Sequence, residues 1–135
     1  MIAAVTNQGN ARFMIYSGAL NPPRLITFMR RLIKDARSKV FLILDNLNVQ
    51  KAKVVNAWLA DHADRIEVFY LPPYSPELNP SECFNGDLKG EIQRGIPPKD
   101  VVELKRTVLG HSRRIQKSPA RVRSYFRNKH ISYAA

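Results

Sequence analysis

Val40-Phe-Leu-Ile-Leu-Asp-Asn46 is the stretch that decides the fold class. An unbroken apolar run of this length, ending in polar residues, is typical of a strand buried on both faces in a parallel sheet. A second such run, Ile66 to Leu71, follows a segment over Lys51 to Ala60 whose apolar residues recur at helical spacing. Parallel strands joined by a helix form a β-α-β unit, so the sequence predicts an α/β domain.

The chain on either side of this unit adds a hairpin and several helices. Asn7-Gln8-Gly9-Asn10 separates two short apolar runs, Ile2 to Thr6 and Ala11 to Tyr16, and Asn and Gly tolerate positive φ, so we expect a β-hairpin there. Apolar spacings of three and four predict further helices after Pro23, after Pro80, from Asp100 and after Ser118.

Leu71-Pro-Pro-Tyr-Ser-Pro-Glu-Leu-Asn-Pro80 contains four of the nine prolines. Because proline fixes φ, we expect a stiff connector without secondary structure of its own. A stiff connector also fixes where the next residue lands, which matters when a side chain has to meet a metal ion.

The charge of the 135-residue chain is concentrated at its C-terminal end. The whole chain carries 22 Lys and Arg against 11 Asp and Glu, for a net charge of +11, and residues 104–135 hold nine basic residues and no acidic one. Such a charge favours a polyanionic partner, because binding to phosphates releases condensed counterions. A merely solvated helix face explains the charge equally well, and a membrane surface is a weaker third choice.

Composition excludes several classes of protein. Cys83 is the single cysteine, so an internal disulfide is impossible, and the sequence has no His/Cys cluster for structural zinc. No apolar stretch approaches the roughly 20 residues that span a bilayer, and no secretory signal precedes the first strand. We therefore expect a cytoplasmic protein without membrane contact.

Two acids stand where chemistry could occur. Asp45 directly follows a predicted buried strand, and ligands of open α/β sheets bind outside such strand ends. Glu82 comes two residues after the proline connector, and the two carboxylates could converge on Mg²⁺, which prefers oxygen ligands. Each acid also has a simpler interpretation: Asp45 as a turn or cap residue, and Glu82 as the third-position acid of a capping box with Asn79.

Five segments together carry a resemblance to a known family. They are Val40-Phe-Leu-Ile-Leu-Asp-Asn46, Val54-Val-Asn-Ala-Trp-Leu59, Leu71-Pro-Pro-Tyr-Ser-Pro-Glu-Leu-Asn-Pro-Ser-Glu82, Asn85-Gly-Asp-Leu-Lys89, and Val122-Arg-Ser-Tyr-Phe126 with the terminal Tyr133-Ala-Ala135. They resemble bacterial insertion-sequence transposases of the mariner-like superfamily, which have a DDE endonuclease domain of ribonuclease H-like fold.

The resemblance implies a metal site and its residues. Asp45 would be the second acid of the DDE triad and Glu82 the third, with Asn46 and Asn79 supporting the site. In this family two divalent ions, usually Mg²⁺ and alternatively Mn²⁺, activate a water or a DNA 3′-hydroxyl and stabilise the leaving oxygen. Relatives often have His shortly after the Asp-Asn pair, where this chain has Gln50-Lys51.

DNA at transposon ends and targets would be the partner, and the protein would be nucleoid-associated. Contacts to DNA are expected from the basic C-terminal residues Lys105, Arg106, Arg113, Arg114, Lys117, Arg121, Arg123 and Arg127.

The resemblance also implies a gap. The family's first acid lies on the first, central strand, and this chain starts at what resembles the second strand; Asp35, the only earlier acid, falls near a helix end. We therefore expect a C-terminal fragment, inactive alone, in which residues 1–96 form a partial ribonuclease H-like catalytic domain and residues 97–135 its basic helical segment. We expect a homo-oligomer or a complementing N-terminal fragment as the protein partner, and upstream or other-chain sequence would supply the missing acid.

Two other functions remain open from the sequence. A non-catalytic DNA-binding or regulatory remnant would use the basic tail and would bind DNA without either acid. A folded chain with no retained function would bind neither metal nor DNA.

Overall fold

The structure is a computed structural model that describes residues 1–45 and 47–135. The chain forms two compact units. The hairpin unit contains Met1–Ile15 and Pro80–Ala135, and the strand-pair unit contains Tyr16–Asn79. Residue 96 falls inside the hairpin unit, in which the helices Pro80–Arg94 and Val101–Gln116 both contact the N-terminal hairpin.

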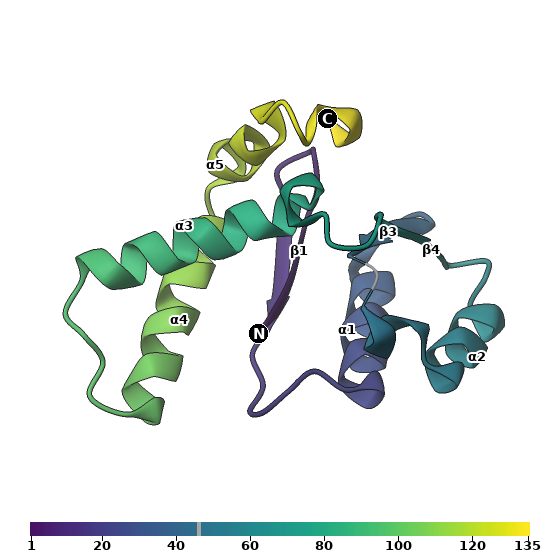
Figure 1. Ribbon diagram of the computed structural model, residues 1–135, viewed down its shortest axis with the longest axis horizontal. Coiled ribbons are helices and arrows are strands. Elements are labelled where there is room, and N and C mark those ends of the chain that lie inside the picture. Colours follow the sequence, from purple (N-terminus) through teal and green to yellow (C-terminus); the bar gives the residue numbers. More distant parts are fainter. Residues whose placement is uncertain (46) are drawn as a thin grey trace. The chain divides into compact units, whose positions relative to one another are not determined.

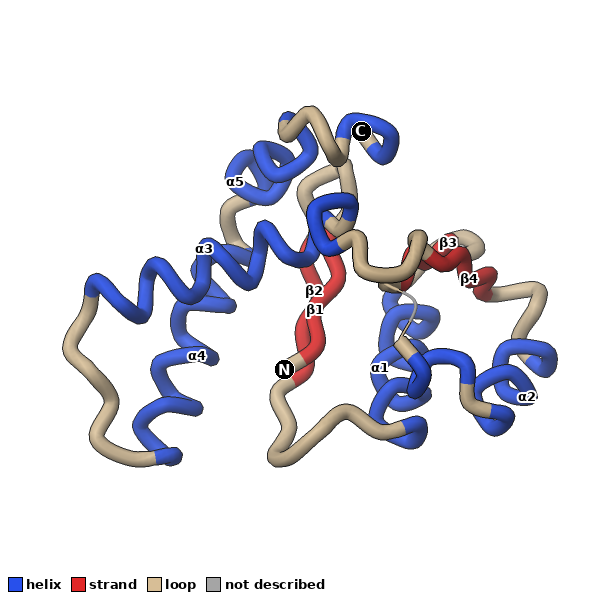
Figure 2. The backbone as a smooth tube through the Cα atoms, viewed as in Figure 1, coloured by secondary structure: helices blue, strands red, loops and turns tan. Residues whose placement is uncertain are grey.

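The strand-pair unit contains the expected β-α-β arrangement. Its elements are α1 (Pro22–Asp35), β3 (Val40–Leu44), the 3₁₀ turn η1 (Asn48–Lys51), α2 (Lys53–Asp61), β4 (Ile66–Tyr70) and the 3₁₀ turn η2 (Pro76–Leu78). β3 and β4 lie side by side (Figure 2). They pair in parallel, with Val40 opposite Ile66 and Leu44 opposite Tyr70. The predicted parallel pair joined by a helix is confirmed.

Local signals explain where α1 begins and what it buries. The Asn21 side chain accepts a hydrogen bond from the Arg24 N–H at 2.9 Å and caps the helix, and two prolines follow in the first turn. The apolar face packs into the core of the unit through Leu25, Ile26, Phe28, Met29 and Ile33. Helix α1 contacts α2, which buries Val55 and Trp58.

The strand pair is buried on one face only. Leu42 and Leu44 are buried, but Phe41 is 63% exposed and Phe69 is 47% exposed, with their ring centroids 6.4 Å apart. The prediction of strands buried on both faces is therefore wrong. Apolar residues on both faces gave β3 an unbroken apolar pattern, and a pattern of hydropathy does not show whether a second layer is present.

The hairpin unit combines the N-terminal strands with the C-terminal helices (Figure 1). Its elements are β1 (Ile2–Val5), β2 (Ala11–Met14), α3 (Pro80–Arg94), α4 (Val101–Gln116), α5 (Pro119–Ser124) and the 3₁₀ turns η3 (Tyr125–Arg127) and η4 (Ser132–Ala134). β1 and β2 are antiparallel, which confirms the predicted hairpin. The buried core contains Ala11, Phe84, Leu88, Ile115, Val122, Tyr125, Phe126 and Ile131.

Gly9 lies where the hairpin turn packs closely against α5. Its φ is +97°, and a Cβ at this position would lie 2.7 Å from the Pro119 carbonyl oxygen. Glycine is required here both by the backbone conformation and by the close approach of α5.

The proline connector is less irregular than expected. η2 gives it one 3₁₀ turn, in which the N–H groups of Leu78 and Asn79 donate to Ser75 and Pro76 carbonyls.

In the described part of the chain, each strand pairs with a single neighbour. None of the described helices combines the length and the apolar character needed to cross a membrane.

Candidate metal centre

Asp45 is the first residue after β3 and is half-buried. The Leu71 N–H donates to the Leu44 carbonyl at 2.8 Å, which extends the parallel pairing to the last residue of the strand. Asp45 therefore lies at the carboxyl-terminal edge of the strand pair, the edge at which α/β sheets bind ligands.

Gln50 holds the Asp45 carboxylate. Its Nε2 donates to Asp45 Oδ1 at 2.6 Å, and its Oε1 accepts from the Leu47 N–H at 2.8 Å. The residue is 4% exposed. In the sequence, Gln50 stands out only because relatives often have His in this region, and no role for the residue follows from that. The one signal that could have identified it is a polar residue five positions after Asp45.

The turn that carries Gln50 is tied to the end of β4. The Tyr70 hydroxyl donates to the Gln50 carbonyl at 2.9 Å, and Lys51 Nζ lies 5.7 Å from the centre of the Tyr70 ring. Since Tyr70 is the register partner of Leu44, both strands of the pair support the geometry around Asp45.

The chemistry of Asp45 fits a hard divalent cation. Among the described residues, the hydrogen bond to its carboxylate reaches Oδ1, so Oδ2 is available to a cation. Mg²⁺ usually binds proteins through one or two carboxylates and keeps several waters. No three His, Cys, Asp or Glu side chains form a cluster in the described parts of the chain, so Asp45 can be one ligand of such a site and not the whole of it.

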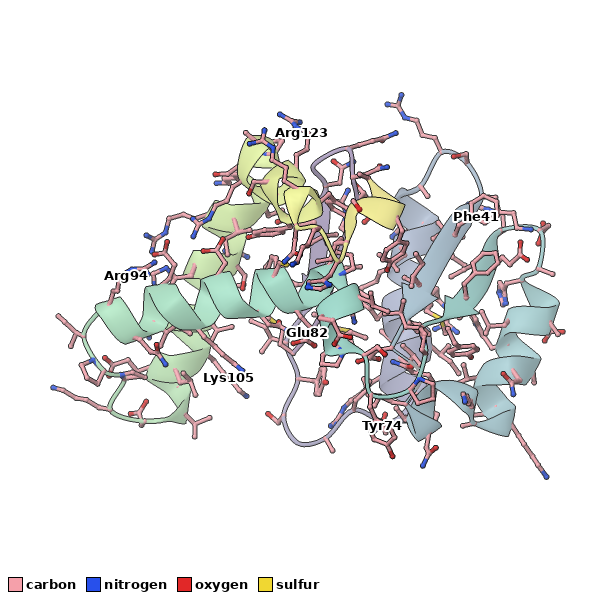
Figure 3. The ribbon with its side chains drawn as sticks, turned by 45° about the horizontal axis from the view of Figure 1, so that its top comes forward. Phe41, Tyr74, Glu82, Arg94, Lys105 and Arg123 are labelled. Atoms are coloured by element: carbon pink, nitrogen blue, oxygen red, sulfur yellow. The ribbon has the colours of Figure 1, made fainter. Side chains whose placement is uncertain are left out.

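Glu82 lies in the first turn of α3 and is exposed (Figure 3). Asp45 belongs to the strand-pair unit and Glu82 to the hairpin unit, so each is positioned within its own unit. Of the two expected supporting residues, Asn79 is buried, and Asn46 lies outside the described residues.

The basic residues predicted to contact DNA differ in their surroundings. Lys105 and Arg123 lie at the surface (Figure 3). The exposed members of the set are Lys105, Arg106, Arg113, Arg114, Lys117, Arg123 and Arg127. Arg121 is different, because it is half-buried and its guanidinium is bound by carboxylates.

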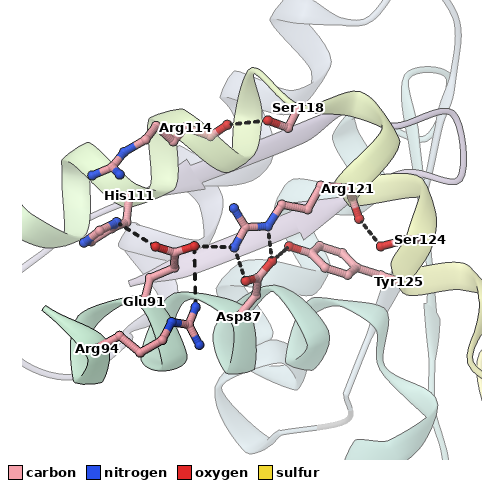
Figure 4. A network of polar contacts seen from close by, with 9 residues as sticks. All are labelled: Asp87, Glu91, Arg94, His111, Arg114, Ser118, Arg121, Ser124 and Tyr125. Carbon is pink, nitrogen blue, oxygen red and sulfur yellow. Dashed lines mark hydrogen bonds and ion pairs between the residues drawn. The ribbon is translucent and has the colours of Figure 1, made fainter.

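Arg121 is the centre of a polar network that joins α3, α4 and α5 (Figure 4). It bonds Asp87 through two nitrogens, with Nε donating to Oδ2 at 2.6 Å, and it bonds Glu91 Oε1 at 2.8 Å. The Tyr125 hydroxyl donates to Asp87 Oδ2 at 2.6 Å, and His111 Nδ1 lies 3.6 Å from Glu91 Oε2. This network gives Arg121 a structural role, which the charge count did not reveal.

The network shifts the titration of its members. Burial by itself would raise the pKa of Asp87, but the hydrogen bonds from Arg121 and Tyr125 outweigh burial and lower that pKa. The hydrogen bond from Arg121 likewise lowers the pKa of Glu91. Burial, followed by the bond to Asp87, raises the pKa of Tyr125. The folded state therefore favours the ionised carboxylates of Asp87 and Glu91 and the neutral phenol of Tyr125.

The fold of the chain is similar to that of a solved transposase catalytic domain. The crystal structure of the catalytic domain of Mos1 mariner transposase matches it with a TM-score of 0.60 and 16% sequence identity, over 95% of this chain and 70% of that chain. A likeness at this identity establishes the fold alone. It confirms a mixed α/β architecture of the mariner catalytic type.

The family follows from the sequence. Residues 1–105 match the model of the DDE superfamily endonucleases, and the chain belongs to that family. No match was found among curated protein sequences. The resemblance inferred from the Asp45 and Glu82 motifs is thus confirmed at the level of the family.

Proposed function

We propose that this chain is the C-terminal part of a DDE transposase and contributes two acids, Asp45 and Glu82, to phosphodiester cleavage and strand transfer at transposon ends. The observation that carries the proposal is the position of Asp45: a braced carboxylate with one available oxygen at the end of a parallel strand, in a DDE-family chain. Its partner would be DNA, and it would act at the nucleoid of a bacterium.

The chain's own residues would perform three tasks. Asp45 and Glu82 would each offer carboxylate oxygens to Mg²⁺ or Mn²⁺, and Asn46 and Asn79 would support them. The exposed arginines and lysines of α4 and α5 would bind phosphates and orient the DNA. When bound, a pair of divalent ions supplies activation of the attacking oxygen and stabilisation of the leaving oxygen.

The proposal includes inactivity of the chain alone. The resemblance assigns two acids of the triad to this sequence. Asp35, the last residue of α1, is not one of them. A segment outside these 135 residues that carries the first strand of the fold would supply the remaining carboxylate.

Nicking of supercoiled plasmid tests this function. We expect no nicking by the purified chain with Mg²⁺ or Mn²⁺, and nicking once a polypeptide carrying the upstream strand and its Asp is added. Asp45→Asn should abolish that complemented activity, and the exposed Asp64→Asn should retain it. Nicking by the chain alone that Asp45→Asn removes would contradict the fragment proposal.

A second candidate is a DNA-binding remnant without catalysis. It is favoured by the exposed basic side chains on α4 and α5, which lie in residues 104–135, a stretch that contains no acidic residue. It requires DNA binding that is unchanged when both Asp45 and Glu82 are neutralised, whatever the outcome of the nicking experiment.

A further inference from the structure

Gln50 is one of few buried polar side chains in the described residues, at 4% exposure. Burying an amide without hydrogen bonds is costly, so its partners show what the residue does. Both ends of its amide are used, one by the Asp45 carboxylate and the other by the Leu47 backbone.

The two partners determine which way the amide faces. A backbone N–H can only donate, so Leu47 takes the amide oxygen of Gln50; an ionised carboxylate can only accept, so Asp45 takes the amide nitrogen. A flipped amide would lose both bonds. The donor is therefore held in one orientation, 2.6 Å from Asp45 Oδ1.

The backbone of Gln50 is fixed as firmly as its side chain. Its N–H donates to the Leu47 carbonyl at 3.0 Å within the 3₁₀ turn, and its carbonyl accepts from the Tyr70 hydroxyl. These contacts tie the turn to the end of β4, so the amide that reaches Asp45 starts from an anchored position.

We propose that Gln50 is the positioning residue of the metal site, an inference that rests on the proposed function of Asp45. By occupying Oδ1 it sets the rotamer of the carboxylate and leaves Oδ2 for a divalent cation. A neutral amide suits this task, because it donates a hydrogen bond without adding a positive charge that would repel the ion. Partners that orient a metal ligand typically change metal affinity by about 10- to 100-fold when removed.

Paramagnetic broadening by Mn²⁺ tests the proposal on the whole ¹⁵N-labelled chain, without requiring activity. In the wild type we expect Mn²⁺ to broaden the amide signals of Leu44 and Leu47. Gln50→Met keeps the size of the side chain and removes the donor, and it should raise the Mn²⁺ concentration at half-broadening by about tenfold. Gln93→Met makes the same exchange at an exposed position and should leave that concentration unchanged.

A double variant separates positioning from general damage. In an Asp45→Asn background, adding Gln50→Met should produce no further shift, because its effect passes through the Asp45 carboxylate. A further shift there, or an equal midpoint in wild type and Gln50→Met, would overturn the positioning role while leaving the metal site in place. Absence of Mn²⁺ broadening at Leu44 and Leu47 in the wild type would instead remove the metal site itself, and the role of Gln50 with it.

Discussion

Asp87 is the residue on which the polar network of the hairpin unit depends most. Its carboxylate accepts from both Arg121 and Tyr125, and its side chain is 19% exposed. Asp87→Asn removes the charge that pairs with the half-buried guanidinium, and hydrogen bonds to charged groups contribute about 1.5–3 kcal/mol. We expect the free energy of unfolding to fall by about 1–3 kcal/mol, measured by urea unfolding followed with far-ultraviolet circular dichroism.

Asp64→Asn is the matched control, because it makes the same exchange at an exposed carboxylate and should change stability by less than about 0.5 kcal/mol.

The pH dependence of the stability follows from the lowered pKa of Asp87. The stabilisation by the ionised Asp87 carboxylate is fully present above its unfolded-state pKa of about 3.9. It is lost as the pH falls through the lower pKa of the folded state. The stability gap between wild type and Asp87→Asn should therefore narrow as the pH falls below about 4; a constant gap would contradict the assignment.

Glycine has opposite roles in two elements of the hairpin unit. Gly9 has positive φ and lies against Pro119, whereas Gly110 is inside α4 with open space around it. Gly9→Ala should destabilise the chain by more than about 1 kcal/mol, because strain and a steric clash combine. Gly110→Ala should stabilise it by about 0.5–1 kcal/mol through helix propensity. Thermal unfolding of both variants checks the pair, and shifts of the same sign would refute this account.

At the scale of the whole molecule, the charge distribution predicts how the chain binds DNA. If the C-terminal helices contact about four to six phosphates, the logarithm of affinity should fall against the logarithm of salt concentration with a slope of roughly −4 to −5. Fluorescence anisotropy with a labelled duplex measures this slope. Asp45→Asn and Glu82→Gln should leave it unchanged, and an affinity independent of salt would exclude the basic surface as the binding site.

Two arginines refine this prediction. Arg127 is exposed, so Arg127→Gln should reduce the magnitude of the slope by about 0.9, the loss of one phosphate contact. Arg121 is held by Asp87 and Glu91, so Arg121→Gln should lower the stability of the chain and leave the slope unchanged. Equal effects of both variants on the slope would show that the network opens when DNA binds.

The sequence alone was sufficient to predict the hairpin, the parallel pair of Val40–Leu44 with Ile66–Tyr70, the helix that starts at Pro80 and the family. These features depend on local signals: apolar periodicity, turn residues and proline positions within a few residues of each element. Asp45 and Glu82 could be selected as candidate site residues from the sequence, because each follows a recognisable local motif.

Other features were decided by contacts between distant parts of the chain. The exposed face with Phe41 and Phe69 depends on which layers cover the strands, and the pairing of Arg121 with Asp87 joins residues 34 positions apart. The contact of Gln50 with Asp45 depends on a turn that Tyr70 holds from the next strand. Hydropathy and charge belong to single residues, whereas burial and pairing belong to the assembled fold, which is why only the tertiary structure could assign them.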